Sequence, residues 1–136
     1  MKRAEAPKIV RDLLERKGQS PIYTTIATQS VSEANSLMRD HNVRSLLVLD
    51  GENRLWGIVT RTDIDLKVNL EGLNPNEARV GQIMTPIEKI VTVDIETDLE
   101  ECKALMKQHK IRHLPVVKQG DIPEGIISTT DFAFSR

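Results

Sequence analysis

The sequence is poor in cysteine and in long apolar runs, and each shortage excludes a class of protein. Its one cysteine, Cys102, cannot form an internal disulfide, which favours a reduced, cytoplasmic setting. The longest apolar run, Leu46 to Leu49, is far shorter than the roughly 20 residues that span a bilayer. Met1-Lys2-Arg3 is followed by a mixed polar and apolar stretch, so we expect no signal peptide and no membrane association.

Aromatic residues and an excess of charge of one sign are also missing. The 19 basic residues nearly balance the 20 acidic ones, so the chain lacks the electrostatic footprint of a nucleic-acid-binding protein. The aromatic residues are one Tyr, one Trp and two Phe. We therefore expect an aliphatic core and no platforms on which bases could stack.

The sequence does contain a seven-residue motif that occurs twice, called the phrase below. Gly57-Ile58-Val59-Thr60-Arg61-Thr62-Asp63 returns as Gly125-Ile126-Ile127-Ser128-Thr129-Thr130-Asp131, an offset of 68 residues (125 minus 57). Sliding residues 22–68 onto 90–136 needs no gap, which indicates an internal duplication. The residues identical in both copies are Ile22, Thr24, Glu33, Leu37, Met38, His41, Arg44, Leu46, Val48, Gly57, Ile58, Thr62 and Asp63.

Hydrophobic periodicity predicts the same order of elements in both halves. Capping boxes are predicted at Ser30 with Glu33 and at Asp98 with Glu101. Gly18 and Asn42 are expected to end helices. The predicted helices are 8–17, 31–41, a segment opening at 60–63, a turn at 80–84 and one after 98; the predicted strands are 22–26, 46–49, 55–59, 90–93, 114–117 and 125–127.

The repeated phrase has two interpretations. Thr60 and Ser128 occupy the N-cap position of a helix, with Asp63 and Asp131 three residues later, so each pair forms a capping box that needs no ligand. The same geometry suits a ligand: the helix start favours phosphate, the hydroxyl can donate to a phosphate oxygen, and the carboxylate can accept from ribose hydroxyls. Spacing alone favours the cap.

Several further motifs resemble those of the paired cystathionine-β-synthase domain, the CBS pair or Bateman module. They are His109-Lys110-Ile111-Arg112-His113-Leu114-Pro115-Val116, its first-half match from His41 to Val48, the Val80 to Pro86 segment, and the two copies of the phrase. The resemblance covers residues from about 8 to the C-terminus. It implies an α/β (α+β) fold of two β-α-β-β-α repeats packed sheet to sheet about a pseudo-twofold axis. The expected boundaries are 8–70 for the first motif, 71–79 for a linker and 80–136 for the second motif.

The resemblance also implies a ligand and its contacts. Adenosine-containing ligands are expected in clefts between the repeats, with ribose on Asp63 and Asp131 and phosphate near Thr60 and Ser128. First-strand residues around Thr24 and Thr92 would meet the base or ribose. The candidate phosphate partners are Arg44, Arg112 and His113.

The two clefts are expected to be unequal, because the copies depart from the family pattern differently. Leu47 replaces the proline that the second copy keeps as Pro115, and Ser45 replaces His113. Family members often have a proline after the first strand, where this chain has Ala27 and Ile95.

We therefore predict a non-catalytic regulatory module that binds AMP, ADP, ATP, NAD(H) or S-adenosylmethionine, forms a homodimer and regulates another protein. A ligand-independent dimerisation or scaffold domain is the alternative; a nucleic-acid-associated module is disfavoured by the balanced charge. The sequence contains neither a glycine-rich phosphate loop nor a nucleophile elbow, so no motif predicts an enzyme. His109 and His113 have metal-ligand spacing, but the chain enters a strand between them, so no metal site is predicted.

Overall fold

The computed structural model describes residues 6–18 and 22–134, and these form two compact units. One unit comprises residues 22–90. The other combines the described residues at the N-terminus with those from 91 onward. The duplication is therefore visible in the fold, but the N-terminal helix packs with the second half of the chain rather than with the first.

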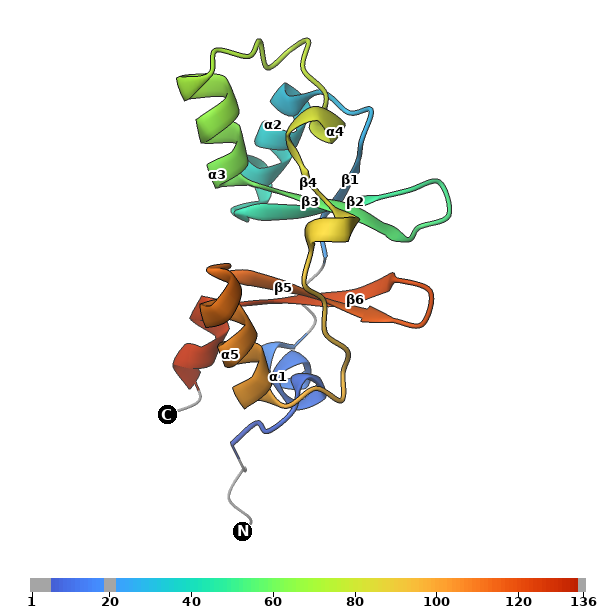
Figure 1. Cartoon of the computed structure of the whole chain (residues 1–136), viewed down its shortest axis with the longest axis vertical. Helices are drawn as coiled ribbons and strands as arrows, with labels where there is room; N and C mark the ends of the chain where they lie inside the picture. Colours follow the sequence, from blue (N-terminus) through green and yellow to red (C-terminus); the bar gives the residue numbers. More distant parts are fainter. Residues whose placement is uncertain (1–5, 19–21, 135–136) are drawn as a thin grey trace. The chain divides into compact units, whose positions relative to one another are not determined.

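The unit of residues 22–90 is a four-stranded sheet with helices on one face (Figure 1). The strand order is β1-β2-β3-β4, with β1 parallel to β2 and the other pairs antiparallel. Its elements are β1 (Thr24–Ile26), α2 (Val31–His41), β2 (Ser45–Leu49), β3 (Leu55–Thr60), α3 (Arg61–Ile64), the π-helical turn η1 (Asp65–Leu70), α4 (Val80–Ile83), β4 (Thr85–Pro86) and the 3₁₀ turn η2 (Ile87–Lys89).

Local sequence explains why α2 begins and ends where predicted. The Ser30 hydroxyl accepts a hydrogen bond from the Glu33 amide at 3.1 Å, which satisfies one of the free donors of the first turn. Asn42 ends the helix in the left-handed conformation at φ 53°, which asparagine tolerates. Between these caps, Val31, Ala34 and Met38 are buried against the sheet.

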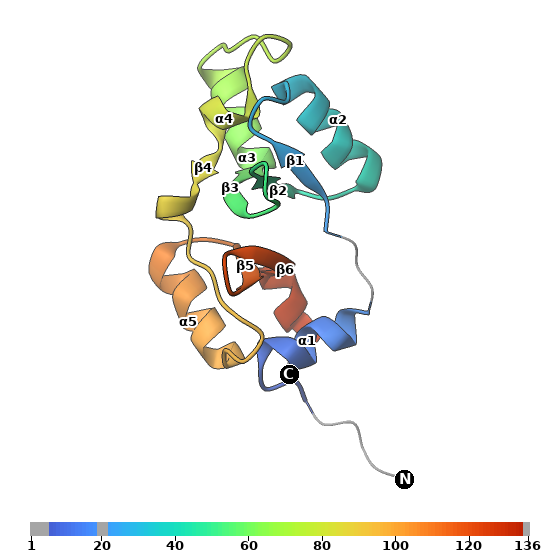
Figure 2. The ribbon, with the colours of Figure 1, turned by 90° about the vertical axis from the view of Figure 1, so that its right-hand side faces the viewer.

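The other unit has the same plan with a shorter sheet (Figure 2). Its elements are α1 (Val10–Lys17), α5 (Leu99–His109), β5 (His113–Lys118), β6 (Ile122–Ser128) and the 3₁₀ segment η3 (Thr129–Phe134). Two antiparallel strands, β5 and β6, form the sheet. Val10 and Leu13 of α1 lie in one buried cluster with Leu99, Cys102 and Leu114, among others.

Helices α1 and α4 dock in the same way in their respective units. Backbone amides of Val10 and Arg11 donate to the Thr97 and Ile95 carbonyls, both at 2.9 Å. In the unit of residues 22–90, Val80 and Gly81 donate to Gln29 and Ala27, at 2.8 and 2.9 Å. The acceptors match at the 68-residue offset (97 minus 29), whereas the helices match at 70 (80 minus 10). The repeat therefore includes a further segment, formed by α1 and α4, in addition to the one that the ungapped alignment of residues 22–68 with 90–136 identifies.

Three predicted details of local structure are wrong. Asp98 makes no side-chain cap; instead the Leu99 amide donates to the Lys8 carbonyl at 2.9 Å, so the docked N-terminal segment satisfies this helix start. The predicted strand 90–93 is reduced to a single parallel bridge between Val93 and Val116. Thr85 and Pro86, expected only to stop a helical turn, form the short strand β4.

Candidate functional site

The first copy of the phrase brings three of the predicted site residues together. Thr60 ends β3 and pairs with Ser45 of β2, so Arg44, the residue before β2, lies next to the phrase. The Arg44 carbonyl accepts a 2.9 Å hydrogen bond from the Arg61 amide. The Asp63 Oδ2 atom accepts from the Thr60 amide at 2.8 Å and from Thr60 Oγ1 at 3.0 Å.

This arrangement confirms the capping box at the first phrase. The Asp63 amide donates back to Thr60 Oγ1 at 3.2 Å, so the two residues cap each other reciprocally. Such a box satisfies free donors at the start of a helix. The hydroxyl and the carboxylate are thereby fixed side by side, both half-buried, and the exposed Arg44 is a neighbouring cation.

The second copy repeats the framework in the other unit. Ser128 pairs with His113, and the Thr129 amide donates to the Arg112 carbonyl at 3.0 Å. The Asp131 Oδ2 atom accepts from the Ser128 amide at 2.8 Å and from Ser128 Oγ at 3.3 Å. Four predicted residues therefore gather here: Arg112, His113, Ser128 and Asp131.

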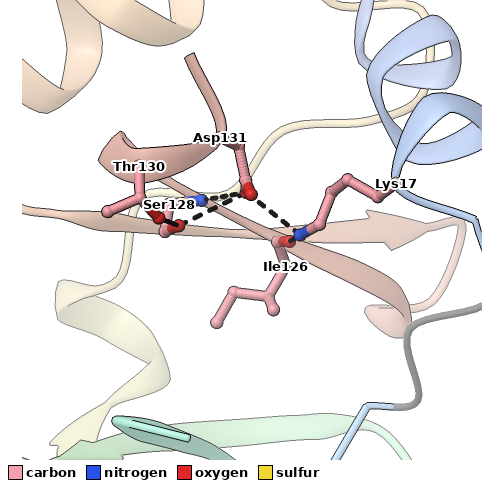
Figure 3. A network of polar contacts seen from close by, with 5 residues as sticks. All are labelled: Lys17, Ile126, Ser128, Thr130 and Asp131. Carbon is pink, nitrogen blue, oxygen red and sulfur yellow. Dashed lines mark hydrogen bonds and ion pairs between the residues drawn. The ribbon is translucent and has the colours of Figure 1, made fainter. Parts of the chain in front are cut away.

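One residue at the second phrase was missed by sequence reasoning. Lys17, the last residue of α1, places its Nζ atom 3.0 Å from Asp131 Oδ2 and 3.0 Å from the Ile126 carbonyl oxygen (Figure 3). The side chains of Lys17 and Asp131 are only 20% and 13% exposed. Lys17 and Asp131 are 114 residues apart, and the sequence offered no signal beyond the weak similarity of residues 8–14 to 78–84.

The glycine of each phrase is where the docked helical segment approaches the strand. A Cβ atom on Gly125 would lie 3.0 Å from a methyl group of Leu14. A Cβ atom on Gly57 would lie 2.5 Å from the Met84 sulfur and 2.9 Å from the Thr85 carbonyl oxygen. Leu14 and Met84 correspond at the 70-residue offset (84 minus 14), so both glycines serve the same close contact.

No described side-chain hydrogen bond joins the remaining predicted residues, Thr24 and Thr92, to the capping pairs. Thr24 is on β1, in a row that runs from Thr24 through Leu47 to Ile58. It opens onto a pocket of about 570 Å³ formed by β1, α2 and the β2–β3 hairpin, whose lining does not include Thr60 or Asp63. Thr92 precedes the Val93 bridge and is half-buried.

Two other side chains with reactive groups, Cys102 and His41, are held in packing contacts. Burial, and secondarily the charge of Glu101, raises the pKa of the Cys102 thiol to about 11, and Cys102 lies in the buried core of its unit. His41 stacks on Tyr23 with ring centroids 4.0 Å apart. Across the described ranges, no three His, Cys, Asp or Glu side chains are grouped as metal ligands would be. No described helix is both long and apolar enough to cross a bilayer.

Comparison with known proteins places this geometry in a family. The family model for the CBS domain matches residues 10–68 and 80–135. The chain is 35% identical over 115 residues to the mitochondrial CBS domain-containing protein CBSX3 of Arabidopsis thaliana, and 31% identical over 117 residues to an uncharacterised 17.7 kDa protein of Acidianus ambivalens. These matches cover 80% and 82% of the chain but only 55% and 65% of the two relatives.

Solved structures match over nearly the whole chain. The CBS-domain-containing protein ATU1752 of Agrobacterium tumefaciens has a TM-score of 0.86 and 26% identity, covering 100% of this chain and 98% of its own. The CBS domain pair of MJ0100, in complex with 5′-methylthioadenosine and S-adenosyl-L-methionine, has a TM-score of 0.79 and 25% identity, with 92% of both chains covered. A hexameric CBS-CP12 protein from bloom-forming cyanobacteria has a TM-score of 0.80 and 32% identity, covering 96% of this chain and 68% of its own.

Proposed function

The chain belongs to the CBS domain family, and we propose that it is a non-catalytic regulatory module whose ligand is an adenosine-containing small molecule. The observation that carries the proposal is the paired hydroxyl and carboxylate, fixed at the same strand register in both repeats. The complex of the MJ0100 pair with two adenosyl compounds supports the ligand class.

The chemistry of the phrase suits such a ligand. A ribose presents two adjacent hydroxyl donors, and a carboxylate held by neighbouring bonds can accept from them without a large loss of side-chain entropy. Thr60 and Ser128 donate their hydroxyl protons to the carboxylates in this structure, and each could donate to phosphate instead by rotating its O–H bond. Arg44 and Arg112 are exposed, and a guanidinium binds phosphate oxygens in a bidentate manner.

We further propose that ligand binding shifts how the module meets a regulated protein, and that two copies form a homodimer in the cytoplasm. A ligand can shift such an equilibrium only by its differential affinity for the two states. The ligand class proposed here spans AMP, ADP, ATP, NAD(H) and S-adenosylmethionine.

A scaffold domain without a ligand is the second candidate, and one observation favours it. The Thr60–Asp63 box is complete within the protein, so the phrase has a structural role whether or not a ligand binds. In that case the two carboxylates would matter for stability alone.

A thermal-shift panel with AMP, ADP, ATP, NADH and S-adenosylmethionine separates the two candidates. A ligand at 100 times its dissociation constant stabilises the folded state by about 2.7 kcal/mol. The double variant Asp63→Asn with Asp131→Asn should lose this shift and keep a cooperative melt. The matched control, Glu77→Gln with Glu100→Gln, neutralises two exposed carboxylates and should keep the shift.

The scaffold would be favoured if no adenosyl compound moved the melting temperature of the wild-type protein. It would also be favoured if the Asp63→Asn and Asp131→Asn changes lowered the melting temperature without ligand and changed nothing else.

A further inference from the structure

The two phrases differ in what else touches the carboxylate. Asp131 Oδ2 accepts from the Ser128 amide, Ser128 Oγ and Lys17 Nζ, at 2.8, 3.3 and 3.0 Å. The described contacts of the Asp63 carboxylate are to Thr60 alone, at 2.8 and 3.0 Å. The framework is therefore repeated, but among the described residues an ammonium group contacts the carboxylate of the second copy only.

Packing fixes the lysine in place. Lys17 is the last residue of α1, whose residues Val10 and Leu13 are fully buried in the core of the same unit. Its side chain is 20% exposed, and its ammonium also donates to the Ile126 carbonyl. At the 70-residue offset the corresponding residue is Ile87, which cannot supply a cation.

The Lys17 ammonium occupies part of the acceptor capacity of the Asp131 carboxylate, and a ribose bound through the same oxygen, Oδ2, would have to displace it. Removing one partner from a largely buried ion pair leaves the other charge poorly compensated, which is strongly unfavourable. The paired carboxylate also has its charge balanced locally, so it attracts a hydroxyl donor less than an ionised carboxylate without a cation does. Asp63 has neither handicap in its described contacts.

We propose that Lys17 reserves Asp131, so that Asp63 is the carboxylate that accepts the ribose hydroxyls and each chain holds one ribose-anchored adenosine. This inference rests on the proposed function and adds to it the choice between the two phrases. Lys17 is here a specificity-determining residue that acts by occupying a carboxylate.

Isothermal titration of the whole chain with AMP and with 2′,3′-dideoxy-AMP tests the proposal. Wild type should bind one AMP per chain and lose at least tenfold in affinity with the dideoxy compound. Asp63→Asn should abolish this preference for the ribose hydroxyls, whereas Asp131→Asn should leave it unchanged. Lys17→Met should create a second ribose-dependent site, and the control Lys107→Met, which removes an exposed charge of the same unit, should not.

The outcomes separate this inference from the function on which it rests. A ribose preference lost in Asp131→Asn but kept in Asp63→Asn would overturn the inference and leave the proposed function standing, as would two ribose-dependent sites in wild type. The comparison of the two aspartate variants holds even if Lys17→Met fails to fold. Absence of binding by AMP and S-adenosylmethionine in wild type and all variants would overturn both.

Discussion

An alanine at Gly57 should destabilise the protein more than an alanine at Gly125. At Gly125 the new methyl group would meet only a Leu14 methyl group at 3.0 Å and its neighbour at 3.3 Å, and a side chain can move by a few tenths of an ångström. At Gly57 it would meet the Met84 sulfur at 2.5 Å and also the Thr85 carbonyl oxygen at 2.9 Å. The carbonyl belongs to β4, which is hydrogen-bonded to β3, so the backbone itself must shift.

The magnitude follows from two opposing effects. Overpacking a well-packed core costs about 1–3 kcal/mol, while replacing glycine by alanine restricts the unfolded chain and returns about 0.4–1 kcal/mol. We expect a net loss of about 2 kcal/mol for Gly57→Ala and about 1 kcal/mol or less for Gly125→Ala. With a urea m-value of about 2 kcal/mol per molar, the first should lower the unfolding midpoint by about 1 M.

Double-mutant cycles in urea locate the cause. Leu14→Ala should reduce the loss of unfolding free energy that Gly125→Ala causes, with a coupling free energy of at least about 0.5 kcal/mol. Met84→Ala should relieve Gly57→Ala only in part, because the Thr85 carbonyl remains. Equal losses at the two glycines, or no coupling between Gly125 and Leu14, would refute the proposed close contact.

Two further predictions concern the core of the unit that contains α1. Leu13→Ala should lower the free energy of unfolding by about 2–5 kcal/mol in urea, because Leu13 is fully buried; the control Leu70→Ala, at a 77% exposed residue, should change it by no more than about 0.5 kcal/mol. A small effect at Leu13 would contradict its place in this core. Cys102, with a pKa of about 11, should resist iodoacetamide in the native protein at pH 7.5 and react in denaturant, since the thiolate is the nucleophile. Its native reactivity should rise as the pH approaches 11; rapid native labelling at pH 7.5 would be inconsistent with a buried thiol.

The elements between the phrases were predictable because their signals are local. Alternating and continuous apolar runs placed the ends of β2, β3, β5 and β6 within one residue of those observed, except that β6 begins three residues earlier than predicted. Gly18 and Asn42 end α1 and α2 with positive φ, at 75° and 53°, a conformation that both residue types tolerate. The ungapped 68-residue match also implied equal strand pairing, and Thr60 with Ser45 indeed corresponds to Ser128 with His113.

Local signals did not predict where α1 and α4 dock. Helix α1 docks in the unit that contains residues 91 onward, and α4 docks in the unit of residues 22–90. The docked segments align at an offset of 70 residues, whereas the remainder of the repeat aligns at 68. An alignment without gaps therefore does not extend to the docked segments. Few side chains are identical in the two docked segments when they are aligned at the 70-residue offset. Val10 aligns with Val80, and Leu13 and Leu14 align with Ile83 and Met84. What they share is backbone hydrogen bonding to the loop before each long helix, which depends on position and not on residue type.

The two phrases differ because the docked segments differ: Ile87 stands where the other segment has Lys17, and a proline also ends the shorter helix early. Helix α1 continues for eight residues to Lys17, whereas α4 has four and ends before Thr85-Pro86. Proline removes a backbone donor and disfavours the helical conformation at the residue before it, so Thr85 is extended and pairs with Ile58 of β3. At the 70-residue offset, Pro86 takes the place of Arg16, and the turn that would present a side chain to Asp63 does not form. The repeat keeps its capping carboxylates in both halves, but in the part of the chain that the structure describes an ammonium contacts only Asp131, in the half whose docked helix continues to Lys17.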